Sequence, residues 1–180
     1  MPLSKRVLVV AFSCLSIFAA AQQSDQVIAE RVLGPQWKQL SRRAGMIFAG
    51  TVLATTLPTA ATQSLTTRSA VPDRTVAAGV LALAGAVQLS FRVDQAIAGV
   101  ERGQILTIHE WTGAWSMHRP MSNGQHILIF LYPLSRLGFT SPVGGSLGQV
   151  VLDPSGKNVS QSVSVVQLER AIRSARGEEE

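Results

Sequence analysis

Cysteine, charged residues and aromatic residues are all scarce in this chain of 180 residues. It contains one Cys and one Tyr, 15% of its residues are charged, and 6% are aromatic. A single Cys excludes an intramolecular disulfide framework. No apolar run reaches the roughly 20 residues that a membrane-spanning helix needs, and no repeat marks a solenoid or a propeller. The 46% hydrophobic composition and the length predict one globular domain.

The first 21 residues have the pattern of a secretory signal peptide. Lys5 and Arg6 precede an uncharged apolar run, Val7 to Ala21, which ends in the small residues that a signal peptidase reads. We therefore expect residues 1–21 to be removed and the protein to be periplasmic or secreted. A buried N-terminal helix or an uncleaved anchor is the alternative.

Removal of this segment changes the charge and the cysteine content. About 159 residues remain, with a net charge of about +3 and no Cys, because Cys14 lies in the signal segment. A chain of this length buries enough apolar surface to fold without disulfides. The low charge and the absence of basic runs do not favour nucleic acid as a partner, and the remaining chain predicts no membrane span.

The rest of the sequence predicts a mainly β domain between two helical segments. Residues 22–43 predict a helical lead-in, interrupted at Gly34-Pro35, and residues 154–180 a helix with an acidic tail. Residues 58–75 predict a long mobile connection. The segments with strand character between residues 44 and 153 are 46–53, 87–94, 104–111, 125–132 and 149–152. Five short strands with Gly-containing bends predict a small, closed or nearly closed antiparallel barrel, with a β sandwich as the alternative.

Local patterns support several of these elements. Val87, Leu89, Phe91 and Val93 alternate with polar residues, which predicts a strand with one buried face. The run 125–132 is apolar at successive positions and predicts a strand covered on both faces. Gly50 predicts a bulge, and Ser164 with Gln167 predicts a capping box at the start of the last helix. We expect Arg170, Arg173 and Arg176 on that helix to form a solvated face.

Three strand motifs resemble those of the tissue inhibitors of metalloproteinases and the related netrin module, which are OB-folds. The motifs are Ile47-Phe48-Ala49-Gly50-Thr51-Val52, Leu89-Ser90-Phe91-Arg92-Val93-Asp94 and Gly124 to Tyr132. The resemblance covers roughly residues 44–153 and implies a five-stranded OB-like barrel with an N-terminal and a C-terminal helix. The segments 110–113, 131–138 and 140–145 resemble exported bacterial proteins without an assigned activity.

One departure from the inhibitor family concerns activity. Those inhibitors chelate the zinc of their target with the amine and carbonyl of an N-terminal Cys. Without signal residues this chain begins near Gln22 and has no Cys, so it can form neither that zinc wedge nor the disulfides of the family. A shared fold therefore does not imply a shared activity.

Two residue sets suggest catalysis. Gly144-Gly145-Ser146-Leu147-Gly148 matches the nucleophile elbow, but that motif needs a strand before the Ser and a helix after it, and here a Pro/Gly loop precedes a strand-like run. His109, His118 and His126, with Glu110, offer metal-ligand types without the spacing of a zinc site. A hydrolase using Ser146, or a metal-dependent enzyme using these His residues, is the alternative function. The leading prediction includes no catalytic residue, metal or cofactor.

The loop from Trp111 to Arg119 is the most distinctive segment for binding. It places Trp111, Trp115, His118 and Arg119 between two strands, and Arg136 follows in the next loop. Trp and Arg are frequent at binding hot spots because they combine contact area with a polar group. The alternative is that both indoles plug one end of the barrel. We therefore predict an exported, non-enzymatic binding or structural module whose partner is an envelope or extracellular protein or a glycan.

Overall fold

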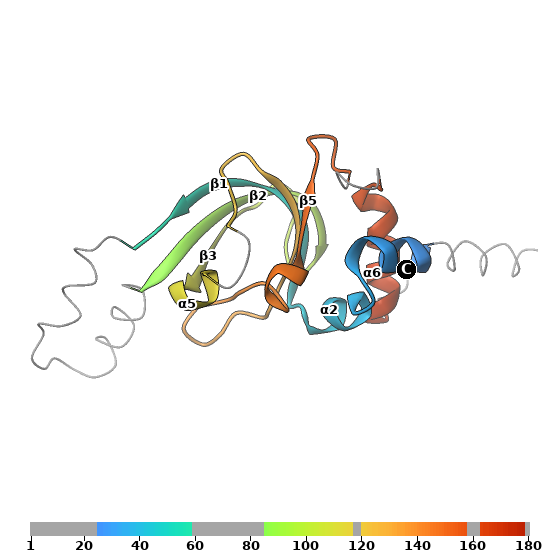
Figure 1. The fold of residues 1–180 in the computed structure, drawn as a ribbon, viewed down its shortest axis with the longest axis horizontal. Coiled ribbons are helices and arrows are strands. Elements are labelled where there is room, and N and C mark those ends of the chain that lie inside the picture. The colour runs from blue at the N-terminus through green and yellow to red at the C-terminus, as the bar shows by residue number, and fades with distance from the viewer. Residues whose placement is uncertain (1–24, 59–84, 117–119, 158–162, 179–180) are drawn as a thin grey trace, which may run out of the picture.

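The computed structural model describes residues 25–58, 85–116, 120–157 and 163–178 (Figure 1). The predicted signal peptide and all but the first residue of the predicted 58–75 connection lie outside these ranges. Residues 25–33 are helical, as the sequence predicts. The other elements, in chain order, are α2 (Trp37–Arg43), β1 (Met46–Thr56), β2 (Ala86–Ala98), β3 (Ile105–Trp111), α5 (Thr112–Trp115), β4 (His126–Leu131), η1 (Gly145–Gly148), β5 (Gln149–Leu152) and α6 (Val165–Arg176).

The five strands form one antiparallel sheet, in the order β3-β2-β1-β4-β5. This confirms the mainly β class with helices on the N- and C-terminal sides. Figure 1 shows the sheet curled at one end of the molecule, which also carries α5, and α2 and α6 packed against the other end. Because β1 is central, it pairs with β2 on one side and with β4 on the other.

Residues 139–143 connect the two sides of the curled sheet. Phe139 forms a parallel bridge with His109 of β3, and Pro142 forms an antiparallel bridge with Leu131 of β4. The Thr140 N–H donates to the His109 carbonyl at 3.0 Å, and the Val143 N–H donates to the Phe130 carbonyl at 2.8 Å. Hydrogen bonding therefore continues from β3 through this segment to β4, as an OB-like barrel requires.

Two hydrophobic clusters lie on opposite faces of the sheet. The barrel core, inside the curl, comprises Met46, Phe48, Val52, Val87, Leu89, Phe91, Val93, Ile108, Met121, Ile127, Ile129 and Leu131. The helix-face core joins the outer face to the helices and includes Trp37, Leu40, Ile47, Leu128, Phe130, Leu152, Val165, Leu168 and Ile172. Successive residues of β4 and of the first part of β1, Met46 to Val52, alternate between the two cores, so these segments are buried on both faces. This confirms the prediction for residues 125–132.

The predicted local features are present. The β2 residues Val87, Leu89, Phe91 and Val93 are all buried in the barrel core. The register between β1 and β2 shifts at Ala49/Gly50, where a bulge was predicted. Ser164 and Gln167 form both bonds of a capping box at the start of α6. Within the described residues, none of the helices is long and apolar enough to cross a membrane.

Candidate functional site

Phe139 organises the end of the barrel that carries α5. Its ring lies flat on the Trp111 indole, with ring centroids 4.5 Å apart and an interplanar angle of 5°. The imidazole of His109 contacts the same Phe139 ring edge-on at 6.3 Å. His109 and Trp111 are two residues apart on β3 and therefore point to the same, outward face. Phe139 is thus buried between the barrel and two outward side chains, which fixes the position of Trp111.

The two predicted indoles have different environments. Trp115 is partly buried and packs against the barrel core, so it covers one end of the barrel. Trp111 is 47% exposed despite its stacking on Phe139. The plugging alternative therefore fits Trp115, whereas about half of the Trp111 side chain is open to solvent. Predicted site residues His118 and Arg119 lie outside the described residues.

The loop after β4 leaves two large apolar side chains exposed. Leu134 and Leu137 are 54% and 59% exposed. Ser135 closes the loop: its N–H donates to the Phe139 carbonyl at 2.8 Å, and its hydroxyl accepts from the Phe139 N–H at 3.0 Å. This turn precedes Phe139 directly, so Leu134 and Leu137 belong to the same loop as the ring on which Trp111 stacks. The exposed Arg136 lies in the same turn.

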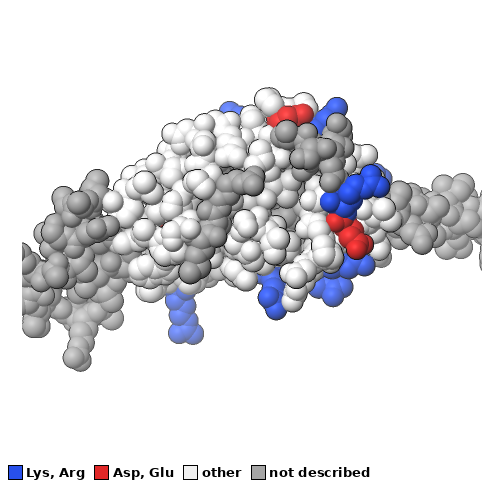
Figure 2. Space-filling model, in the orientation of Figure 1, with Lys and Arg blue, Asp and Glu red and all other residues white. Residues whose placement is uncertain are grey.

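We call this region the Trp111 surface, defined by Trp111, Leu134, Arg136, Leu137 and Phe139. Figure 2 shows that charged side chains gather mainly over the helical end of the molecule, whereas the barrel end is largely uncharged on the same face. Neighbouring exposed apolar groups are common at contact sites for other molecules, since their burial releases surface water. The arrangement provides contact area without an evident reacting group.

The described residues of the metal hypothesis, His109, Glu110 and His126, do not converge. His109 points outward to Phe139, whereas its neighbour Glu110 is completely buried and faces inward with Ile108. Adjacent residues of one strand point to opposite faces, so these two side chains cannot ligate one ion without a break in β3. His126 opens β4, which β1 and β2 separate from β3 in the sheet. Among the described residues, no three His, Cys, Asp or Glu side chains converge on one point.

Ser146 does not have the geometry of a nucleophile elbow. It is exposed in the short 3-10 helix η1, which follows Gly144 with its φ of +68° and leads directly into β5. The elbow requires a strand before the Ser and a helix after it. The Gly-x-Ser-x-Gly sequence here instead forms the turn between residues 139–143 and β5.

A polar cluster that the sequence did not predict lies on the outward face of β1, β2 and β4. The Thr51 hydroxyl donates to Asp94 Oδ2 at 2.7 Å and lies 3.2 Å from His126 Nδ1. Arg92 Nε donates to Asp94 Oδ1 at 2.9 Å. The alternation of β2 placed Arg92 and Asp94 on the outer face, but only the register with β1 and β4 brings Thr51 and His126 beside them. Thr51, not His126, lies in the middle of this cluster, so it does not reproduce a nucleophile–His–acid relay.

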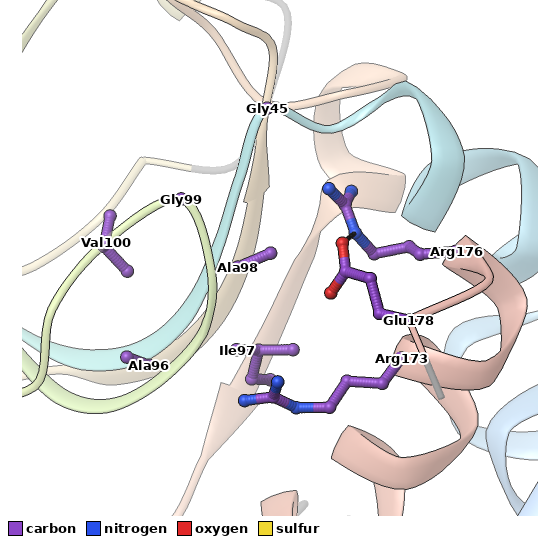
Figure 3. A pocket seen from close by; sticks show the side chains of 9 residues that line it. All are labelled: Gly45, Ala96, Ile97, Ala98, Gly99, Val100, Arg173, Arg176 and Glu178. Atoms are coloured by element: carbon purple, nitrogen blue, oxygen red, sulfur yellow. Dashed lines mark hydrogen bonds and ion pairs between the residues drawn. The ribbon is translucent and has the colours of Figure 1, made fainter. Parts of the chain in front are cut away.

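A hollow of about 400 Å³ lies between the end of β2 and the end of α6 (Figure 3). Arg176 faces it, but its Nη1 donates to the carbonyls of Ser41 and Ala44 at 2.7 and 2.8 Å, and its Nε pairs with Glu178. Arg173 pairs with Glu169 at 2.9 Å. These guanidinium groups connect α6 to the end of α2 and to nearby acids, which makes the hollow a poor anion site.

We expected Arg170, Arg173 and Arg176 to form a solvated face on α6, and this was wrong in one respect: the arginines have specific partners. Arg170 also has an acidic partner, Asp25, at 3.3 Å. The three-residue spacing placed the arginines correctly along one side of the helix. Their partners come from the helical segment 25–33, from α2 and from α6 itself, which the spacing alone does not reveal.

Comparison with protein-family models, with curated proteins and with solved structures finds no match to this chain.

Proposed function

We propose that the protein is an exported, non-enzymatic binding module whose partner, an envelope protein or a glycan, contacts the Trp111 surface. The observation that carries this proposal is the half-exposed Trp111 indole, held flat on Phe139, which closes the loop that carries the exposed Leu134 and Leu137. A preorganised aromatic ring loses little conformational freedom on binding, and Trp is the residue most enriched at hot spots. His118, Arg119 and Arg136 remain predicted contributors to the same surface.

The signal-peptide pattern supports export. The N-terminal sequence of the protein recovered from a periplasmic or culture fraction tests it directly. We expect that sequence to begin near Gln22. A product that retains Met1 or Lys5 in the cytoplasmic fraction contradicts export.

Site-specific photo-crosslinking in the native cell tests the binding role. A photoreactive residue is placed at Leu137, and in separate variants at Val27 and Val166. All three side chains are apolar and more than half exposed, but Val27 and Val166 lie at the helical end. The proposal expects a crosslinked species from position 137 and none of that size from positions 27 and 166. Equal yields at the three positions, or no adduct at position 137, contradict it.

A further inference from the structure

The outward polar cluster forms the floor of a groove of about 310 Å³. Residues of β1, β2 and β4, the turn after β5 and the start of α6 line the groove, among them Gly50, Arg92, Asp94, Gln95 and His126. Gly50 contributes no side chain to this floor, and a Cβ atom at this position would lie 2.5 Å from the Arg92 carbonyl oxygen. Glycine is therefore required for the close approach of β1 and β2. The turn after β5 and the first residue of α6 form the opposite wall.

The polar side chains of this floor are held in place but remain accessible. Asp94 receives bonds from Thr51 and Arg92, yet 37% of its side chain is exposed. His126 is oriented through Nδ1 by the Thr51 hydroxyl, and 29% of its side chain is exposed. Among the described residues, no hydrogen bond uses His126 Nε2 or the Gln95 carbonyl oxygen. Free lone pairs of Asp94, His126 and Gln95 thus lie beside the donor groups of Arg92.

The charge balance restricts the ligand class. Arg92 and Asp94 neutralise each other at 2.9 Å, so the groove attracts neither an anion nor a cation strongly. Its lining offers acceptors and donors side by side. A hydroxyl group both donates and accepts, so neighbouring hydroxyls can bond to Asp94 and Arg92 at the same time. The volume is at the lower end of the range for small-molecule sites.

We propose that this groove, where Arg92 and Asp94 of β2 face His126 of β4 across β1, binds a neutral saccharide unit. The site is separate from the Trp111 surface. Trp111 pairs with Ala86 at the start of β2, whereas Asp94 lies eight residues further along, about 26 Å at the rise of an extended strand. The proposal therefore does not rest on the proposed function, and either one can fail alone.

Titration of the isotope-labelled protein with four sugars, followed by NMR, tests the proposal. The probes are glucose, galactose, mannose and N-acetylglucosamine at millimolar concentrations, with sodium acetate as the charged probe. We expect at least one sugar to shift the resonances of Gly50, Gln95 and His126 in a saturable way, and acetate to leave them unchanged. If none of the four sugars shifts these resonances, or if acetate alone does, the proposal is overturned.

Two variants locate the binding. Asp94→Asn removes the charged acceptor at nearly constant shape, and His126→Ala removes the imidazole; we expect each to weaken sugar binding about tenfold or more. Ser90→Ala is the matched control, because Ser90 is on the same face of β2 and its hydroxyl contacts Thr107 at 3.1 Å, outside the groove. The spectra themselves report whether each variant is folded. Unchanged affinity in both groove variants, or equal loss in Ser90→Ala, overturns the assignment.

Discussion

The helical end and the barrel end of the molecule differ in the chemistry of their surface side chains. At the helical end, Arg170, Arg173 and Arg176 each lie beside an acidic partner. At the barrel end, Trp111 and Leu137 are exposed in an area with few charges. Both ends share one sheet, which has a hydrophobic core on each face. Exposed apolar side chains occur at both ends, so the feature that distinguishes the barrel end is the half-exposed Trp111 stacked on Phe139, and the proposed binding surface is placed there for that reason.

The shared sheet predicts that neither end unfolds alone. Phe91 is completely buried in the barrel core and packs edge-on against Phe48, with ring centroids 5.6 Å apart. Phe91→Ala should lower the free energy of unfolding by about 3–5 kcal/mol because it leaves a cavity. Urea unfolding followed by circular dichroism and by Trp fluorescence should show one transition, since β1 and β4 belong to both cores. Two separate transitions would contradict a single cooperative unit.

The variant Arg176→Met tests whether the Arg176 hydrogen bonds stabilise the packing of α6 against the end of α2. The variant keeps the aliphatic part of the side chain but removes the donors to the carbonyls of Ser41 and Ala44. We expect a loss of about 1–3 kcal/mol in the free energy of unfolding. Arg170→Met is the control: its side chain is 67% exposed, and its ion pair with Asp25 should contribute less than about 1 kcal/mol. Equal losses would show that the Arg176 contacts do not connect the helices.

Trp111→Ala separates stability from binding at the barrel end. The substitution removes the stacking on Phe139 but leaves the barrel core intact. The free energy of unfolding should fall by about 1–3 kcal/mol, because both the stacking and the burial of about half of the indole are lost, which is below the effect of Phe91→Ala. A loss of several kcal/mol in thermal or urea unfolding would identify Trp111 as a structural residue.

The smallest predicted effect concerns the turn after β5. The Ser155 hydroxyl and the Lys157 N–H both donate hydrogen bonds to the Asp153 carboxylate. These bonds, the Ser155 bond most of all, lower the pKa of this carboxyl below its ordinary value of 3.8. A lowered pKa contributes stability above the unfolded value that is lost as the pH falls through the folded value. Stability measured from pH 5 downward should therefore decline slightly less steeply in Asp153→Asn than in the natural protein. A steeper decline in the variant would contradict this sign.

The sequence predicts the elements that depend on local pattern. The alternation of Val87, Leu89, Phe91 and Val93 identifies β2, the apolar run 125–132 identifies the strand covered on both faces, and Ser164 identifies the start of α6. In each case the feature depends on residues within one element. The predicted export, the resemblance to metalloproteinase inhibitors and the binding role remain predictions.

Features that depend on register were not predicted. Residues 139–143 contain Pro142 and follow Gly138, so their composition indicates a loop, yet they connect β3 to β4. The same holds for the groove, because Thr51, Asp94 and His126 come from three strands and meet only through the pairings of β1. Sequence spacing within a strand shows which face a side chain occupies, but not which residues of other strands lie beside it.

The most direct test of the binding role is the crosslink yield from position 137 in the Trp111→Ala background, relative to the same position with Trp111 present. If Trp111 is the centre of the contact, the yield should fall about tenfold or more while the protein remains folded. An unchanged yield would show that the partner does not use the indole and would contradict the account of this surface.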